Sequence, residues 1–196
     1  CSDLSNSFVS IALVANGIIT TRCSDVIITK NTFNTTDGTG VKIESVNGMT
    51  TITDNIFIDN DFACINLQES GIEAGDVLNH NERVIISNNH FIRPLNSGVS
   101  SESSGNAVHN VTISDNIFDS CVSYGIKASG NNTQILNNKF IGSPKTRAGG
   151  DTDATCILVV NKASALTKNM TISGNIFDMV NEDYLTPTQD VIRLGG

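Results

Sequence analysis

Two glutamates occupy the same position in two similar short segments of the chain. Glu44 ends the segment GVKIE, Glu102 ends the segment GVSSE, and Gln68 takes this position in the intervening segment CINLQ. If the three segments are neighbouring strands, two inter-strand spacings separate the glutamate backbones by about 9 to 10 Å. A carboxylate pair at that separation leaves room for a water molecule, as inverting glycoside hydrolysis requires. The pair therefore predicts a hydrolytic site; the alternative is that both glutamates only solvate an acidic surface.

Other polar residues lie near this row. Glu69 and Asp76 fall in the insertion after Gln68 and are further candidates for catalytic carboxylates. The residues expected to bind substrate are Lys42, Asn66, Gln68, Tyr124, Lys127 and Arg147. Tyr124 is one of two tyrosines in a chain without tryptophan, so it is expected to be exposed and to stack on a sugar ring. Lys127 or Arg147 could instead serve as the base of a lyase or epimerase that acts on uronate polymers.

No cofactor or metal is expected from the sequence. His80 and His109 lie near the insertions, but no metal-ligand spacing joins them, and both are expected to be surface residues. Asp151 and Asp153 together supply too few oxygen ligands for a calcium site.

Length and charge narrow the class of protein. The chain has 196 residues, the size of one domain, and we expect residues 1–196 to be a single domain from a longer protein. The net charge of −8 argues against nucleic acid as a partner, because a duplex-binding surface must be basic. The same charge disfavours anionic membranes, and no apolar run of about 18 residues could insert into a bilayer.

The chain has five cysteines, an odd number whose spacing fits neither a disulfide framework nor a zinc site. They are Cys1, Cys23, Cys64, Cys121 and Cys156. Cys64 and Cys156 begin the apolar segments CINL and CILV, which favours buried, reduced thiols that pack as small apolar groups. Reduced thiols indicate assembly in a reducing compartment, even for a protein that acts outside it.

A repeated Asn-x-Phe motif positions all these residues. Seven of the eight phenylalanines belong to it, in the pairs Asn6/Phe8, Asn31/Phe33, Asn55/Phe57, Asn89/Phe91, Asn116/Phe118, Asn138/Phe140 and Asn175/Phe177. A second apolar segment, usually beginning with Gly or Cys, recurs between the motifs, and one circuit takes about 22 to 24 residues. Segments that are this short, and that end at Gly or Asn, predict strands rather than helices.

Stacked circuits would bury the apolar side that a single circuit leaves exposed. At the usual spacing of about 4.8 Å, the phenylalanines would form one interior column and the isoleucines before each Asn another. The asparagines would bond amide to amide at a tight turn, as in other stacked strands. Asparagine also tolerates the left-handed backbone of tight turns, so we expect the motif asparagines to adopt it.

These Asn-x-Phe and Gly-apolar repeats resemble the right-handed parallel β-helix of pectate lyase-like enzymes and phage tailspikes, over nearly the whole chain. The resemblance implies an all-β solenoid of about seven coils and an extracellular polysaccharide as the partner. It also implies a homotrimer with carboxylates in a groove, located on a virion tail, secreted or at the cell surface. The main rival fold, a leucine-rich repeat, would need a leucine spacing and a helical segment that this period lacks.

Two classes of function follow from this resemblance. The first is an enzyme that degrades a bacterial surface polysaccharide by glycoside hydrolysis, or a uronate lyase. The second is a non-catalytic spacer, receptor-binding or adhesin segment. Function in a solenoid tends to lie in inserted loops and outward strand positions. The insertions lie between Leu67 and Val84, between Val99 and Val111, between Ile141 and Cys156, and before Val191.

Overall fold

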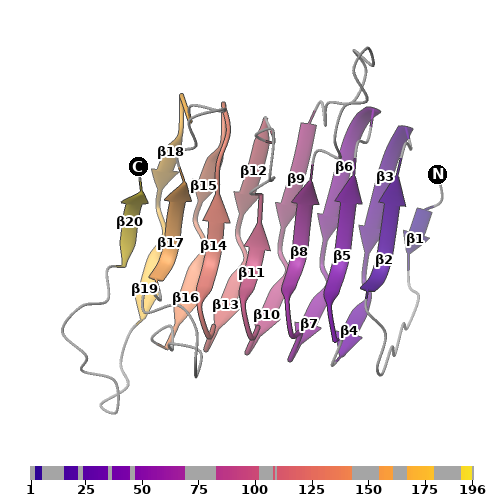
Figure 1. Cartoon of the computed structure of the whole chain (residues 1–196), viewed down its shortest axis with the longest axis horizontal. Helices are drawn as coiled ribbons and strands as arrows, with labels where there is room; N and C mark the ends of the chain where they lie inside the picture. The colour runs from indigo at the N-terminus through magenta and orange to yellow at the C-terminus, as the bar shows by residue number, and fades with distance from the viewer. Residues whose placement is uncertain are drawn as a thin grey trace.

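The computed structural model describes residues 3–5, 16–21, 24–34, 37–44, 47–68, 83–101, 108, 110–142, 155–160, 167–178 and 191–195. All regular elements in these ranges are β-strands, and every pairing between them is parallel. The strands form three sheets, each of which extends along the long axis of the molecule (Figure 1).

Each sheet takes one strand from each successive coil. Sheet A contains β1 (Asp3–Ser5), β3 (Ser24–Thr29), β6 (Asn47–Thr53), β9 (Arg83–Ser87), β12 (Val111–Ser114), β15 (Gln134–Leu136) and β18 (Thr171–Ser173). Sheet B contains β2 (Asn16–Thr21), β5 (Thr39–Glu44), β8 (Ala63–Gln68), β11 (Ser97–Ser100), β14 (Tyr124–Ala128), β17 (Thr155–Val160) and β20 (Ile192–Gly195). Sheet C contains β4 (Thr32–Asn34), β7 (Ile56–Ile58), β10 (His90–Ile92), β13 (Ile117–Asp119), β16 (Lys139–Ile141) and β19 (Ile176–Asp178).

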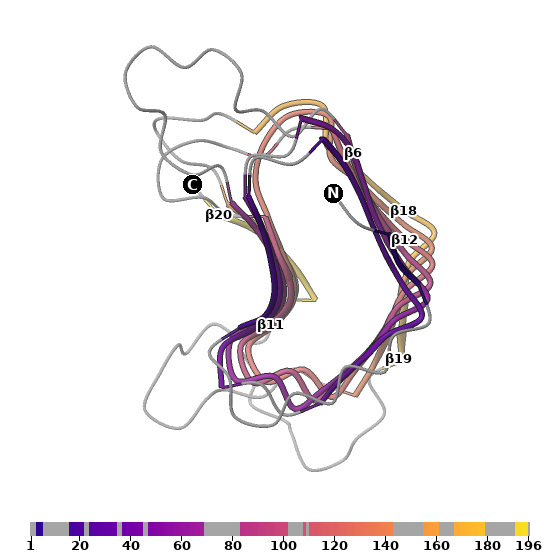
Figure 2. The ribbon, with the colours of Figure 1, turned by 90° about the vertical axis from the view of Figure 1, so that its right-hand side faces the viewer.

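The chain visits the sheets in the order B, A, C and then returns to B one coil further on. The architecture is therefore the predicted right-handed parallel β-helix, and the described strands make seven layers in sheet A, seven in sheet B and six in sheet C. In cross-section, sheets A and B lie on opposite sides of the interior (Figure 2).

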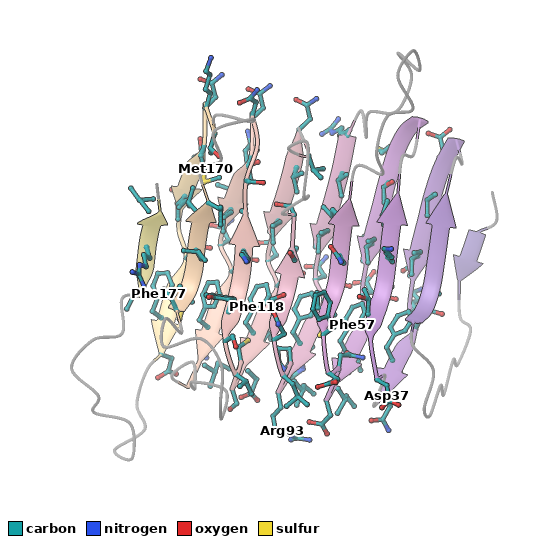
Figure 3. The ribbon with its side chains drawn as sticks, in the orientation of Figure 1. Asp37, Phe57, Arg93, Phe118, Met170 and Phe177 are labelled. Atoms are coloured by element: carbon teal, nitrogen blue, oxygen red, sulfur yellow. The ribbon has the colours of Figure 1, made fainter. Side chains whose placement is uncertain are left out.

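The motif phenylalanines form the predicted interior column. Six rings, from Phe33 to Phe177, are stacked with centroids 4.7 to 5.1 Å apart and interplanar angles of 7° to 13°. Figure 3 shows the column following the axis, with Phe57, Phe118 and Phe177 labelled. Phe8 lies outside the described residues. Since the sheet register places each ring over the next, one residue type is selected at this position in every coil.

The Phe column also explains the recurring glycine of sheet B. A Cβ atom on Gly98 would lie 2.6 Å from the Phe118 ring, and a Cβ atom on Gly125 would lie 2.6 Å from the Phe140 ring. Real Cβ atoms essentially never come that close to another atom, so a larger residue would have to displace a fully packed ring. At Gly98 and Gly125 glycine is therefore favoured because the aromatic column approaches the backbone, whereas Cys64 and Cys156 take the same register position in β8 and β17.

The motif asparagines form an amide ladder on the inside of the turn between sheets A and C. Its members are Asn31, Asn55, Asn89, Asn116, Asn138 and Asn175. From Asn31 to Asn138, the backbone N–H and the side-chain Nδ2 of each member donate to the Oδ1 atom of the asparagine in the next coil, over 2.9 to 3.1 Å. Asn31, Asn55, Asn89, Asn116 and Asn138 are at most 1% exposed.

The prediction that the ladder asparagines adopt the left-handed backbone is wrong by one position. The left-handed residue is the one before each ladder asparagine, as in Lys30, Asp54 and Asn137, with φ of 59°, 58° and 53°. The ladder asparagine itself is retained because its amide satisfies buried backbone groups, which otherwise would lack partners.

A second amide ladder lies on the outside, before the strands of sheet A. Asn132 Nδ2 donates to Asn110 Oδ1 over 3.0 Å, and Asn169 Nδ2 donates to Asn132 Oδ1 over 3.1 Å. All three side chains are exposed, and all three residues have positive φ, between 53° and 57°. Here asparagine serves the left-handed turn and the ladder together, which the sequence pattern did not indicate.

We expect Asn116→Ala to lower the free energy of unfolding by about 3 kcal/mol or more, because several buried hydrogen-bonding groups would lose their partner. Asn132→Ala, which removes an exposed ladder amide, should cost less than about 1 kcal/mol. Urea unfolding followed by circular dichroism measures both values. Equal losses in the two variants would contradict the dominant role of the buried ladder.

Candidate functional site

The outer face of sheet B carries the predicted row of polar side chains. Lys42, Asn66, Ser100 and Lys127 are register partners in four successive strands, β5, β8, β11 and β14. Leu158 of β17 and Arg193 of β20 continue the row. Because the strands are parallel and in register, these side chains recur at one inter-strand spacing, about 4.8 Å. We refer to Lys42, Asn66, Ser100 and Lys127 as the polar row.

The backbone of sheet B gives this row a particular setting. Figure 2 shows the side of the cross-section with β11 and β20 bending toward the interior, so the outer face of the sheet is concave. Segments 69–82, 143–154 and 161–166 directly adjoin strands of sheet B in the sequence, and segments 102–107 and 179–190 are one residue away from such strands. All five lie outside the described residues.

The polar row is partly buried. Lys42, Ser100 and Lys127 are half-buried, and Asn66 is only 4% exposed. The buried Oδ1 atom of Asn66 accepts no hydrogen bond within the part of the chain that the structure describes. Unsatisfied acceptors of this kind are uncommon in folded proteins, so Asn66 has capacity for one further donor.

Tyr124 does not have the expected exposure. Its side chain is 5% exposed, and the Nζ atom of Lys127 lies 5.5 Å from the centroid of its ring. An ammonium group at that distance is attracted to the face of the ring. The prediction that Tyr124 is exposed and stacks on a sugar is therefore wrong, because its ring is covered, in part by the ammonium group of Lys127.

The predicted carboxylate pair is only partly placed by the structure. The backbone of Glu44 pairs in register with Gln68, as predicted from the sequence. Ser100 is in register with Asn66, so residue 102 follows Ser100 at the same distance as Gln68 follows Asn66. Glu69, Asp76, Glu102 and Arg147 lie outside the described residues, and their roles stay predictions.

Three cysteines are buried thiols, as predicted. Cys64, Cys121 and Cys156 are at most 5% exposed and belong to the hydrophobic core, whereas Cys1 and Cys23 lie outside the described residues. Burial raises the pKa of Cys64 and Cys121 well above the ordinary thiol value, and neighbouring cysteines add to the rise. Burial raises the pKa of Cys156 to about 12. All three are therefore protonated at neutral pH.

The described residues show neither a metal-binding cluster nor a membrane span. Across these ranges, no three His, Cys, Asp or Glu side chains come together as a metal site requires. In the same ranges there is no helix long and apolar enough to cross a bilayer.

One family of proteins matches this chain. A family model described as "Periplasmic copper-binding protein (NosD)" matches residues 3–182, which is most of the sequence. No curated protein and no solved structure matches the chain.

The buried thiols predict a loss of stability at alkaline pH. In the unfolded chain the Cys156 thiol ionises near pH 9, whereas in the folded protein it stays protonated until about pH 12. The free energy of unfolding therefore falls as pH rises from 9 to 12, by up to about 1.4 kcal/mol per pH unit.

Denaturant unfolding at several pH values measures this effect. The wild-type protein is compared with Cys156→Ala, so that the contribution of this one thiol is isolated. We expect the wild-type curve to fall more steeply above pH 9. Parallel curves for the two proteins would show that the thiol does not have the raised pKa.

Proposed function

Because the chain belongs to the NosD family of β-helical proteins, we propose that it acts in the periplasm or at the cell surface and binds an extended acidic polysaccharide there. The observation that carries this proposal is the polar row on sheet B, which presents Lys42, Asn66, Ser100 and Lys127 one coil apart.

A repeating surface suits a repeating ligand. The polar row offers a charged or hydrogen-bonding side chain in each of four successive strands, on a concave sheet face (Figure 2). A polymer laid along the axis would meet these groups in turn, so that several weak contacts add into one affinity. Asn66 is only 4% exposed and its Oδ1 atom is buried, so the direct contacts would come from the half-buried side chains of Lys42, Ser100 and Lys127.

Charge favours an acidic polymer. The chain carries a net charge of −8, yet the row contains Lys42 and Lys127, and Arg193 extends it on β20. Cations concentrated along one face of an acidic protein attract anionic ligands to that face and away from the rest of the surface. A uronate polymer, with one carboxylate on each acidic sugar, is the ligand class that this charge pattern would select.

The family description names copper, and the described residues do not fit a copper site. Copper is held by thiolates and imidazoles, whereas Cys64, Cys121 and Cys156 are buried and protonated. His90 on β10 is half-buried, but within the described ranges it belongs to no group of three His, Cys, Asp or Glu side chains. Cys1, Cys23, His80 and His109 lie outside the described residues. Metal binding is therefore not part of the function that we propose.

Hydrolysis of the bound polymer is a second proposal, which rests on the register of sheet B. Glu44 ends β5 one coil away from Gln68, and the sequence places Glu102 at the equivalent position one coil further. Two carboxyl groups separated by two coils would suit an acid and a base that act on opposite faces of a sugar. The phage tailspike and homotrimer interpretations stay predictions, since the family description names the periplasm rather than a virion.

We expect the double substitution Lys42→Gln and Lys127→Gln to weaken binding of polygalacturonate by at least about tenfold, because two charge-assisted contacts would be lost. Isothermal titration of the full chain with polygalacturonate, and with neutral dextran for comparison, measures this. Lys139→Gln on sheet C is the matched control and should bind like the wild type. Unchanged affinity in the double variant, or equal affinity for dextran, would refute the sheet B site.

We expect Glu44→Gln and Glu102→Gln each to reduce depolymerisation by about 10²-fold or more, as loss of a general acid or base does. Chain length and new reducing ends are followed on the same polymer, with Asp54→Asn, at an exposed turn, as control. Shortening with an unsaturated product would indicate a lyase instead. Full activity in both glutamine variants would rule out the carboxylate pair, and binding without shortening would leave a binding protein.

A further inference from the structure

A polar depression is lined by outward-facing residues of sheet A. Sheet A lies on the opposite side of the interior from sheet B, which carries the polar row (Figure 2). The depression has a volume of about 310 Å³, and its lining residues are Arg83, Asn110, Thr112, Asn132 and Gln134. They come from the strands β9, β12 and β15 and from the turns that precede the last two. We call this feature the sheet A depression.

The register of sheet A brings the lining residues together. Thr112 and Gln134 are direct partners in neighbouring strands. Arg83 and Asn110 directly precede another pair of partners, Val84 and Val111. Three successive coils therefore contribute to one site, and the strands and short turns build it without long loops.

The outer amide ladder fixes part of this lining. Asn132 Nδ2 donates to Asn110 Oδ1 over 3.0 Å, and Asn132 Oδ1 in turn accepts from Asn169 Nδ2. Both amide planes are thus held in place before any ligand arrives, which reduces the entropy lost on binding. The ladder does not continue into the coil of Arg83, because an arginine takes the place of the next asparagine there.

The lining is rich in donors and includes no carboxylate. Arg83 has an exposed side chain, and it forms no ion pair with any residue in the described ranges. The guanidinium of arginine is a rigid fork of N–H donors that matches a carboxylate with two parallel hydrogen bonds. Thr112 and Gln134 add a hydroxyl and an amide, which can donate to or accept from sugar hydroxyls.

We propose that the sheet A depression binds a single carboxylate-bearing sugar, a hexuronate, with the carboxylate on Arg83 and the ring hydroxyls on Thr112 and Gln134. Its volume lies at the small end of the range for ligand sites, about 300 to 1,000 Å³, which suits one sugar rather than a chain. The sugar could be free or the terminal unit of a polymer. This site contains no residue of the polar row, so its test does not depend on whether a polymer binds to sheet B.

The test compares glucuronate with glucose, which has the same ring but no carboxylate, by saturation-transfer NMR and calorimetry on the full chain. We expect glucuronate to bind and glucose to bind at least about tenfold more weakly, since only glucuronate forms the paired charge-assisted bonds. Equal binding of the two sugars, or no binding of glucuronate, would overturn the proposal. A glucuronate-terminated oligosaccharide in the same assay separates a terminal unit from the free sugar.

Variants assign the binding to this depression. Arg83→Ala should lower glucuronate affinity at least about tenfold. Gln134→Glu should lower it similarly, because it places a like charge in the lining at an exposed position. Arg93→Ala, at an exposed turn where Arg93 pairs with Asp59, is the matched control and should bind as the wild type does. Melting temperatures confirm that each variant is folded; unchanged affinity in folded Arg83→Ala would refute the site.

Discussion

The hydrogen bonds that join each ladder asparagine to its counterpart one coil away govern this fold. Asn116 illustrates it, since its side chain accepts from the backbone and amide of Asn89 and donates to Asn138 and to the carbonyl of Ile86. No other side chain has a donor and an acceptor in that geometry with so small a volume. The ladder therefore fixes the register of all three sheets, and the Phe column and the sheet B glycines follow from that register.

Because the interior repeats, the exterior can vary without cost to the fold. Outward positions of sheet B change from Lys42 to Asn66, Ser100 and Lys127, while the inward neighbours Val41, Ile65, Val99 and Ile126 stay apolar and fully buried. The same scaffold can thus present a cationic row on one face and the sheet A depression on another. Membership of a β-helical family fixes the interior pattern and leaves the chemistry of the surface to individual residues.

The interior could be predicted from the sequence because each interior residue must match its counterpart in the next coil. Phe33 to Phe177, the asparagine ladder and the rows of sheet B were all visible as repeats with constant spacing. The left-handed residue was misplaced by one position, because Lys30, Asp54 and Asn88 share a backbone conformation and not a residue type. Local conformation leaves a weaker trace in the sequence than packing does.

The candidate sites were harder to predict because they depend on contacts that do not repeat. Tyr124 was expected at the surface, but its burial beneath Lys127 depends on side-chain packing that spacing does not encode. The sheet A depression was not predicted. Asn110 and Asn169 each directly precede an apolar residue, Val111 and Met170, but this pattern did not show that their side chains are hydrogen-bonded in a ladder. Only the register of sheet A reveals that these asparagines form the outer ladder.

The two amide ladders run in opposite directions along the axis. On the inside, each asparagine donates toward the C-terminal coil, from Asn31 to Asn55 and onward, whereas on the outside Asn169 donates back to Asn132 and Asn132 to Asn110. Each hydrogen bond in such a series polarises the next, so a lone ladder would accumulate a dipole as coils are added. Over the three coils that carry both ladders the two dipoles partly cancel, so the axial field there grows more slowly than a single ladder, or the aligned peptides of an α-helix, would make it grow.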